Sequence, residues 1–295
     1  MSVILITGAS TGIGNLTARS LARAGHTVFA SMRDVAGRNA SNATGLTDLA
    51  AAESLDLRVV ELDVESEESA RTAVAAVVEQ AGRLDVVVHN AGHLVVGYVE
   101  AFTPEDLAHL LDVNAVGAHR VNRAALPYLR EQRSGTLLYV GSTILITTPP
   151  FLGPYVASKA AFDSLAVVTA YEAGRFGIET SIVMPGAIVE GTSHFPNATR
   201  AGDAAVASAY AELDALVAGN EEATRRVFPP GVVATPDRVA DEVTRILGLP
   251  SGQKPFRSVV DVADAGVDHV MRHVDNTREN FVLRMGLGDL LRPAR

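Results

Sequence analysis

Short runs of β-branched residues alternate along this chain with longer stretches rich in alanine and leucine. Continuous apolar strands that alternate with helices are typical of a parallel sheet covered on both faces. The sequence therefore predicts a doubly wound α/β fold with about seven strands. The expected strands are Val3–Thr7, Thr27–Ser31, Arg58–Asp63, Asp85–Asn90, Thr136–Val140, Glu179–Met184 and Ser258–Val260. The expected helices include Leu16–Ala24, Ser66–Gln80, Pro104–Arg130 and Tyr155–Arg175.

Three regions interrupt this alternation without dividing the chain. Asp34–Asp56 is polar and rich in small residues, so we expect a long connection after the second strand. Residues 188–227 lie between two strands and contain an alanine-rich helical piece, Ala204–Ala218, so we expect an inserted lid. Residues 261–295 form a C-terminal extension with a helix over Ala265–Arg284. No repeat or low-complexity linker separates these regions, so all 295 residues are expected to form one domain.

The composition excludes several kinds of site and partner. The chain has no cysteine, which excludes disulfides, thiolate metal sites and cysteine nucleophiles. Its net charge is −9 and it has no basic run, which argues against nucleic-acid binding. No apolar stretch reaches the roughly 18 residues that a membrane span needs, and the first residues do not resemble a signal peptide. We therefore expect a cytoplasmic protein that binds neither nucleic acid nor membrane.

A glycine-rich loop joins the first strand to the first helix. It runs from Thr7 to Gly14 and places glycines at Gly8, Gly12 and Gly14. Glycine permits a tight turn and a close backbone approach to a pyrophosphate, and a helix N-terminus adds free N–H groups and a favourable dipole. The loop is therefore interpreted as a dinucleotide-binding loop, and the alternative is a glycine turn without a ligand.

Tyr155 and Lys159 lie four residues apart at the start of a predicted helix, so they share one face of it. Lys159 is one of only two lysines in a chain whose other basic residues are arginines. An ammonium beside a phenol favours the phenolate and lowers a pKa that is normally about 10. The pair is thus a candidate acid/base for chemistry near neutral pH. Each residue alone could equally be an ordinary side chain of a helix.

The chain resembles the single-domain branch of the short-chain dehydrogenases/reductases from Ser2 to about Thr192. The resemblance implies a Rossmann-like NAD(P)-binding domain and an enzyme that interconverts a small-molecule ketone or aldehyde with an alcohol. The motifs that carry it are Thr7–Gly14, Asn90-Ala91-Gly92, Asn114, Ser142, Tyr155, Lys159 and Pro185-Gly186.

The resemblance also implies four catalytic roles. Tyr155 would be the general acid in reduction and the base in oxidation. Lys159 would lower the pKa of that phenol and bind the nicotinamide ribose. Ser142 would donate a hydrogen bond to the carbonyl oxygen. Asn114 would hold a water that links the lysine to solvent.

The expected cofactor is NADP(H) in preference to NAD(H). Met32 stands where NAD-binding members carry a carboxylate, and Arg33 follows it. A guanidinium can pair with a 2′-phosphate, although the adjacent Asp34 could neutralise it. The expected cofactor contacts are Gly8, Ser10, Gly12, Ile13, Gly14, Arg33, Asp63, Val64, Asn90, Ala91, Gly92, Tyr155, Lys159, Pro185, Gly186, Ile188 and Thr192.

One loop departs from the family pattern. Family members often carry threonine four residues after the glycine of Pro185-Gly186, where this chain has Glu190. Thr192, two residues later, is the alternative contact for the nicotinamide. His89 precedes the Asn90 motif at a position that is often asparagine, and we interpret it as a tolerated substitution. His194 is expected at the surface of the lid, and the alternative is a polar contact to the substrate.

Apolar residues are expected to wall the substrate site, which predicts hydrophobic substituents on the substrate. They are Leu94, Val96, Ile144, Leu145, Phe151, Met184 and Phe195. The alternative is that lid and core packing use most of them.

Three other readings of the sequence remain. The chain could be an NAD-preferring alcohol dehydrogenase of the same family, or a nucleotide-sensing regulator on the same fold. An epimerase or dehydratase of the extended branch would require a different glycine spacing and a larger C-terminal domain. The two long predicted helices, Pro104–Arg130 and Tyr155–Arg175, also suggest a homodimer or homotetramer, because the family commonly pairs them across subunits.

Overall fold

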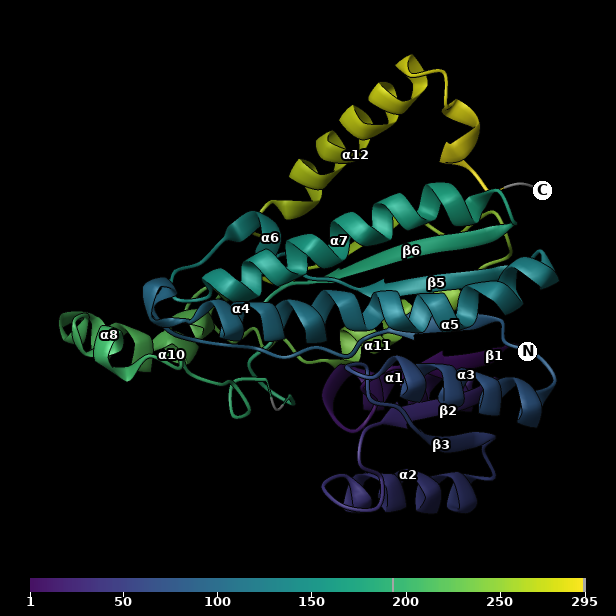
Figure 1. Ribbon diagram of the computed structural model, residues 1–295, viewed down its shortest axis with the longest axis horizontal. Coiled ribbons are helices and arrows are strands. Elements are labelled where there is room, and N and C mark those ends of the chain that lie inside the picture. Colours follow the sequence, from purple (N-terminus) through teal and green to yellow (C-terminus); the bar gives the residue numbers. More distant parts are fainter. Residues whose placement is uncertain (193, 294–295) are drawn as a thin grey trace.

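A twisted sheet of parallel strands forms the centre of the protein (Figure 1). The computed structural model describes residues 1–192 and 194–293. Within these residues the sheet has seven strands in the order β3-β2-β1-β4-β5-β6-β7. The predicted doubly wound α/β class is confirmed, and no strand end differs from its predicted position by more than two residues. The strands are β1 (Val3–Ile6), β2 (Thr27–Met32), β3 (Leu57–Glu61), β4 (Val86–His89), β5 (Gly135–Val140), β6 (Ile178–Pro185) and β7 (Arg257–Val260).

The order of the strands places a crevice at the end of β1. This strand pairs with β2 on one side, through Ile4 and Val28, and with β4 on the other, through Ile4 and Val86. The winding of the chain reverses between these two neighbours, and ligands of open α/β sheets bind at such a switch point, beyond the carboxyl ends of the strands. The loops after β1, β4 and β5 meet at this edge because the strands are parallel.

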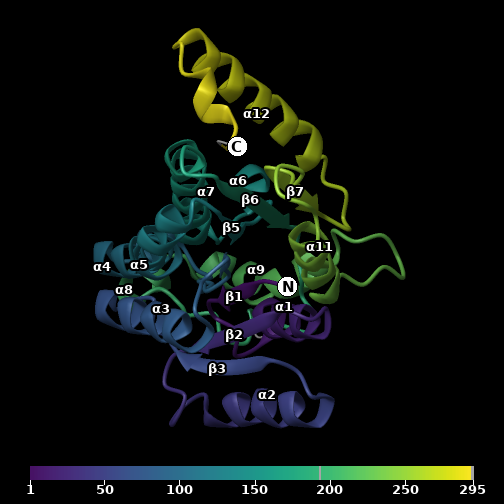
Figure 2. The ribbon, with the colours of Figure 1, turned by 90° about the vertical axis from the view of Figure 1, so that its right-hand side faces the viewer.

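Helices cover both faces of the sheet, as Figure 2 shows. Alternate residues of a strand point to opposite faces, so Leu5 packs in the core under α3, α5 and α7, while Ile4 packs under α1 and α11. No described helix is long and apolar enough to cross a membrane. The longer helices are α1 (Gly12–Arg23), α2 (Ala40–Glu53), α3 (Glu67–Ala81), α4 (Pro104–Leu111), α5 (Gly117–Gln132), α7 (Gly153–Gly174), α11 (Asp237–Leu247) and α12 (Val267–Arg284).

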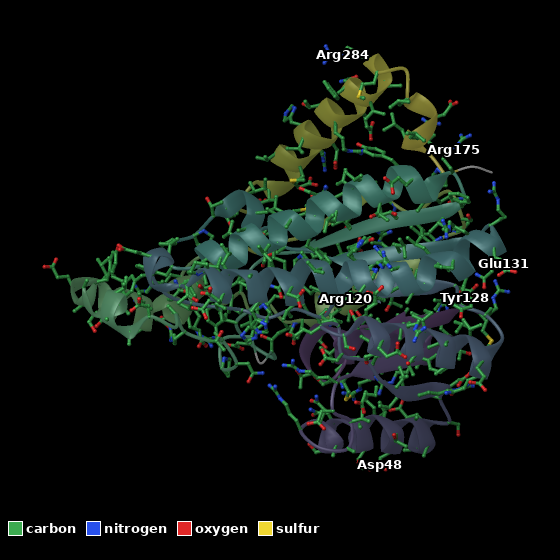
Figure 3. The ribbon with its side chains drawn as sticks, in the orientation of Figure 1. Asp48, Arg120, Tyr128, Glu131, Arg175 and Arg284 are labelled. Atoms are coloured by element: carbon green, nitrogen blue, oxygen red, sulfur yellow. The ribbon has the colours of Figure 1, made fainter. Side chains whose placement is uncertain are left out.

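Two of these helices were not predicted. The segment expected to be a long connection contains α2, in which Leu46 is the one buried residue of the helix. Asp48 points outward from the same helix into solvent (Figure 3). A helix that buries so little shows almost no apolar periodicity, which explains the error. By contrast, α11 buries Val239, Val243 and Ile246 at helical spacing, so its sequence carried a signal that we did not use.

Other predicted helices differ in their bounds. The first helix begins at Gly12 rather than Leu16, so its first turn belongs to the glycine loop. The helix expected over 104–130 is interrupted by a π-turn, η2 (Asp112–Val116), which separates α4 from α5. The alanine-rich lid piece is broken into short segments. These segments and the remaining short elements are η1 (Val99–Ala101), α6 (Ile144–Thr147), α8 (Ala204–Ser208), η3 (Ala211–Leu213), α9 (Asp214–Ala218), α10 (Asn220–Arg225) and η4 (Gly288–Leu291).

An ionic network attaches the C-terminal extension to the sheet. In Figures 1 and 2 the far end of α12 leans away from α7. At its base, the buried Arg257 of β7 pairs with Asp163 of α7 at 2.5 Å and with Asp275 of α12 at 3.1 Å. Arg278 of α12 also donates to the Tyr171 hydroxyl at 3.1 Å. One guanidinium therefore joins three elements, β7, α7 and α12.

Replacing this guanidinium is expected to destabilise the fold. Arg257→Met would leave Asp163 partly buried and unpaired and would leave Asp275 with only Arg278, at 3.4 Å. We therefore predict a loss of about 3 kcal/mol or more in the free energy of unfolding. The control is Arg23→Met, which breaks an exposed pair with Glu53 and should change the stability far less. Urea unfolding of the two variants measures both values, and equal small losses would contradict the role given to Arg257.

Candidate active site

A large cavity lies at the carboxyl edge of the sheet. Its volume is about 1080 Å³, at the upper end of the range for small-molecule sites. Its walls come from the loops after β1, β2, β3, β4, β5 and β6 and from the lid. The described residues contain no cluster of side chains that could hold a metal ion. The cavity therefore has room for an extended organic ligand together with a second small molecule.

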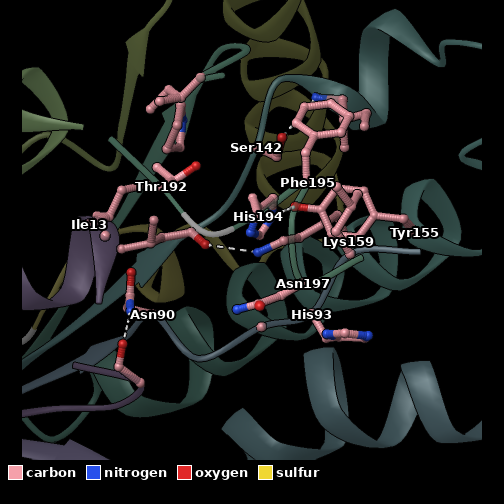
Figure 4. Close-up of a pocket in the computed structure, with 18 of the residues that line it drawn as sticks. Ile13, Asn90, His93, Ser142, Tyr155, Lys159, Thr192, His194, Phe195 and Asn197 are labelled. Atoms are coloured by element: carbon pink, nitrogen blue, oxygen red, sulfur yellow. Dashed lines mark hydrogen bonds between the residues drawn. The ribbon is translucent and has the colours of Figure 1, made fainter. Parts of the chain in front are cut away.

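The glycine loop is fixed by its contact with the loop after β4. The Asn90 amide donates to the carbonyl oxygens of Thr7 at 3.0 Å and Gly8 at 2.9 Å (Figure 4). Gly8 has φ +67°, and a Cβ added there would lie 2.7 Å from the Cα of Ala91. A Cβ on Gly14 would lie 2.4 Å from the Asn90 amide nitrogen. Both glycines are thus required by close packing, independently of any ligand.

The same loop fits a dinucleotide. Thr11 caps α1 without a side-chain hydrogen bond, and no acidic residue occupies the first turn, so backbone N–H groups face the cavity without a side-chain partner. Thr192 lies beside Gly12, and its buried hydroxyl has no hydrogen-bond partner among the residues that the structure describes. Glu190 instead pairs with Arg225 at 2.8 Å and does not line the cavity. Of the two alternatives for the nicotinamide contact, the structure places Thr192 in the cavity.

Almost all of the predicted cofactor residues line this cavity. The exception is Gly14, which lies beneath the loop against Asn90. The residues in the wall are Gly8, Ser10, Gly12, Ile13, Arg33, Asp63, Val64, Asn90, Ala91, Gly92, Tyr155, Lys159, Pro185, Gly186, Ile188 and Thr192.

Tyr155 and Lys159 enter the cavity from the first two turns of α7, and both are buried. The Lys159 ammonium donates to the carbonyl oxygen of Val140 at 3.2 Å. Burial lowers the pKa of Lys159 to about 8 and raises the pKa of Tyr155 above its usual value. The lowered tyrosine pKa that we expected is therefore not found for the protein by itself, because burial removes the phenol from water and disfavours the phenolate.

Ser142 and Asn114 occupy different positions around this pair. Ser142 follows β5, lines the cavity, and accepts a hydrogen bond from the Ile144 N–H at 3.2 Å. Asn114 lies in the π-turn outside the cavity wall. Its amide donates to the His93 carbonyl and to the Ser158 hydroxyl, each at 2.9 Å, and its oxygen accepts from the His93 N–H at 2.7 Å. The Asn114 side chain therefore joins the loop after β4 to α7.

The lid covers Tyr155 with a histidine that we had expected at the surface. His194 lies partly buried with its Nε2 3.2 Å from the Tyr155 hydroxyl, and the two rings meet edge to face (Figure 4). Burial, followed by the charge of Lys159, lowers the pKa of His194 to about 4. The imidazole is therefore neutral near pH 7. The prediction failed because no local pattern indicates that this loop folds back over the cavity.

The structure divides the predicted substrate residues into two groups. Leu94, Ile144 and Phe195 line the cavity. The other four do not line the cavity, because they pack in hydrophobic clusters of the protein interior. Met184 is fully buried in the core beside α7, and Leu145 packs against the same cluster. Val96 and Phe151 pack in a smaller cluster under the lid. Residues of the wall that the sequence did not indicate include His93, His109, Leu152, Asn197, Asn220 and Val227.

Charged residues gather at the cavity end formed by the loops after β2 and β3. Arg33 pairs with Glu65 at 2.9 Å, and the same carboxylate lies 3.2 Å from the Nδ1 of His109. Asp34, which we considered as the neutralising partner of Arg33, instead accepts the N–H of Arg38 at 2.7 Å. Asp34 has a positive φ of 50° and closes its own turn, and Arg33 pairs with Glu65 rather than with this neighbour.

His89 lies buried at the end of β4, just before the loop that holds the glycines. Its Nε2 lies 2.8 Å from the Asn122 oxygen, and the Asn122 amide donates to the Tyr139 hydroxyl at 2.8 Å. Burial lowers the pKa of His89 to about 4 from an ordinary 6.5. The folded protein therefore favours the neutral ring. The stability that His89 contributes through its lowered pKa is fully present above pH 6.5 and is lost as the pH falls from 6.5 toward 4.

Acid should therefore destabilise the protein through His89. Between pH 7 and pH 5 we predict that this one residue removes about 2 kcal/mol from the free energy of unfolding, since one pKa unit corresponds to about 1.4 kcal/mol. His89→Asn keeps a donor for Asn122 and should show a smaller loss over the same range. Urea unfolding at both pH values tests this. The same pH dependence in both proteins would contradict it, because His194 contributes equally to each.

Comparison with known proteins agrees with this geometry. The family model described as short chain dehydrogenase matches residues 2–201. A 3-ketodihydrosphingosine reductase from Bacteroides thetaiotaomicron is 33% identical over 62% of this chain and 63% of its own length. The estradiol 17-beta-dehydrogenase 1 of Rattus norvegicus is 35% identical over 63% of this chain and 54% of its own length. The chain thus spans less than two thirds of the length of these relatives.

Solved structures match over more of the chain. A short-chain dehydrogenase from Streptomyces avermitilis superposes with a TM-score of 0.73 and 28% identity, covering 98% of this chain and 97% of that one. An alcohol dehydrogenase from the archaeon Thermococcus sibiricus, complexed with 5-hydroxy-NADP, has a TM-score of 0.69 and 26% identity, covering 88% and 96%. The lid and the C-terminal extension are therefore included in the similarity to the Streptomyces protein.

Proposed function

Because the chain belongs to the short-chain dehydrogenase family, we propose that it is an NADP(H)-dependent oxidoreductase that interconverts a ketone or aldehyde with an alcohol. The observation that carries this proposal is that Tyr155, Lys159 and Ser142 enter one cavity beside a glycine loop that fits a dinucleotide. The nicotinamide would supply or accept the hydride. The protein's part is to bind the substrate, orient its oxygen and move a proton.

Tyr155 is the proposed proton donor. Burial raises its pKa, so the phenol is protonated near neutral pH and can donate to a ketone oxygen as that oxygen gains negative charge. Ser142, on the same wall, is proposed to donate a second hydrogen bond to this oxygen. A protonated phenol is suited to carbonyl reduction, whereas alcohol oxidation requires its pKa to fall.

Lys159 is proposed to supply the positive charge that lowers this pKa and to bind the ribose. It lies in the cavity wall with its ammonium on the Val140 carbonyl. A Cβ added to Gly92 would lie 3.7 Å from that ammonium and 3.4 Å from the Asn114 oxygen, so the three residues are neighbours. Both amide hydrogens of Asn114 are already donated within the protein. A water relay at Asn114 would therefore use groups other than its amide N–H.

The substrate is proposed to be uncharged, with hydrophobic substituents. The charged side chains of the cavity wall come from the ends of β2, β3 and β7, apart from Lys159. Among the described residues, neither the lid nor the loop after β5 contributes a charged side chain to the wall. Leu94, Ile144 and Phe195 provide apolar surface there instead. A substrate with a carboxylate or phosphate would lack a partner in this half of the cavity.

Two alternative functions lead to different expected behaviour. An NAD-preferring alcohol dehydrogenase is supported by the Glu65 carboxylate, which already pairs with Arg33. A non-catalytic nucleotide sensor would bind the cofactor without turning over any carbonyl compound. We further propose that the protein is cytoplasmic. We also propose a homodimer or homotetramer, because Leu165 and Val168 of α7 are exposed apolar side chains on a helix that the family commonly pairs between subunits.

Tyr155→Phe tests the proposal directly. It removes the proton donor and keeps the ring, so we predict that reduction of a panel of ketones slows by about 100-fold or more while NADPH binding stays within about twofold. The matched control is Tyr171→Phe on the same helix, which should keep normal turnover. Steady-state coenzyme oxidation measures the rates and fluorescence titration measures binding. Full activity in Tyr155→Phe would overturn the catalytic assignment. Coenzyme binding without turnover by the unaltered protein would indicate a sensor.

A further inference from the structure

One carboxylate stands at the end of the cavity where cofactor choice is made. Glu65 follows β3, and its two oxygens contact different partners. Oε2 accepts from the Arg33 guanidinium at 2.9 Å, and Oε1 lies 3.2 Å from the Nδ1 of His109. All three residues line the cavity. The Arg33 side chain is about half exposed, whereas that of Glu65 is 25% exposed, so the carboxylate is the better enclosed partner.

The position of Arg33 decides what this ion pair can do. Arg33 directly follows β2, and in folds of this kind the residue at the end of the second strand contacts the 2′ position of the adenosine ribose. A 2′-phosphate would need the guanidinium that Glu65 already holds. The Glu65 carboxylate would also repel a phosphate that approaches Arg33, because both groups are negatively charged and would lie beside the same guanidinium. The ribose of NADH presents a neutral hydroxyl, which meets neither obstacle.

A second guanidinium stands nearby. Arg38 lines the same end of the cavity, and no salt bridge of its side chain is found in the part of the chain that the structure describes. Asp34 accepts the backbone N–H of Arg38 and leaves its guanidinium unengaged. The end of the cavity therefore offers two cations and one well-placed carboxylate, so its preference between a phosphate and a hydroxyl depends on how far Glu65 offsets Arg33.

We propose that Glu65 is a specificity-determining residue that limits the preference of this protein for NADPH over NADH. Its carboxylate holds Arg33 and must release it before a 2′-phosphate can bind. His109 fixes the other oxygen and keeps the carboxylate directed toward the cavity. The proposal rests on the proposed function, since it requires that the cavity binds a nicotinamide dinucleotide. Its consequence is that the unaltered protein binds both coenzymes, with a small advantage for NADPH.

The variant Glu65→Gln distinguishes the effect of the negative charge of Glu65 from the effect of its side-chain shape. Glutamine keeps the length of the side chain and an oxygen that can accept from Arg33, but it removes the negative charge. Loss of one exposed ion pair and of one repulsion predicts that NADPH binds about three- to tenfold more tightly. The dissociation constant of NADH should change by less than about twofold, because its ribose carries no phosphate.

The measurement is the dissociation constant of NADPH and of NADH, by fluorescence titration of the full chain. Glu67→Gln is the matched control. That glutamate lies two residues away, pairs with Arg123 outside the cavity, and should change neither constant. In an Arg33→Met background, Glu65→Gln should lose the part of its effect that comes from releasing Arg33 and keep only the part that comes from repulsion of the phosphate.

The outcomes distinguish this inference from the proposed function. Tighter NADPH binding confined to Glu65→Gln, and reduced when Arg33 is replaced, supports it. Equal changes for both coenzymes, or no change in either, would overturn the role of Glu65 and leave the proposed reductase intact. If the unaltered protein binds neither coenzyme, the proposed function fails together with this inference.

Discussion

The contact between the loop after β1 and the loop after β4 is the constraint on which the site depends. The backbone of Gly8 approaches Ala91 so closely that a Cβ would lie 2.7 Å from its Cα, and Asn90 donates to two carbonyl groups of the glycine loop. Parallel strands of a sheet end at one edge, so this packing brings the two loops together. The same packing leaves the N-terminus of α1 open toward the cavity. A single close approach thus positions both the glycine loop and the cavity wall beside Lys159.

Burial of the ionisable side chains determines their pKa values in the site. The cavity removes Tyr155 and Lys159 from water, which raises the pKa of the phenol and lowers that of the ammonium. The lid adds to this enclosure through His194, whose pKa is also lowered and whose ring contacts the Tyr155 hydroxyl. Loss of hydration therefore favours the neutral form of all three ionisable groups. Electrostatic interactions with a bound substrate are strengthened by the same loss of hydration.

The sequence predicted the strands because a buried parallel strand has a distinctive composition, seen for example in Val86–His89. It also indicated the glycine loop, Tyr155 and Lys159, which the structure places at one cavity, because these residues stand in short motifs. It could not predict α2, where one buried leucine leaves almost no periodicity. It also could not predict the contacts of His194 with Tyr155 or of Glu65 with Arg33. These pairs are 39 and 32 residues apart, and tertiary folding alone brings them together.

Tyr155 is the proposed proton donor, and its enclosure in the cavity is proposed to set its pKa. The most direct test is to measure that pKa by NMR on protein labelled at the tyrosine ring carbon, with Tyr155→Phe to assign the signal. For the protein alone, the account predicts a pKa above the usual value of about 10, and a lower pKa when the oxidised coenzyme adds its positive charge nearby. A value at or below 10 that the coenzyme does not change would contradict it.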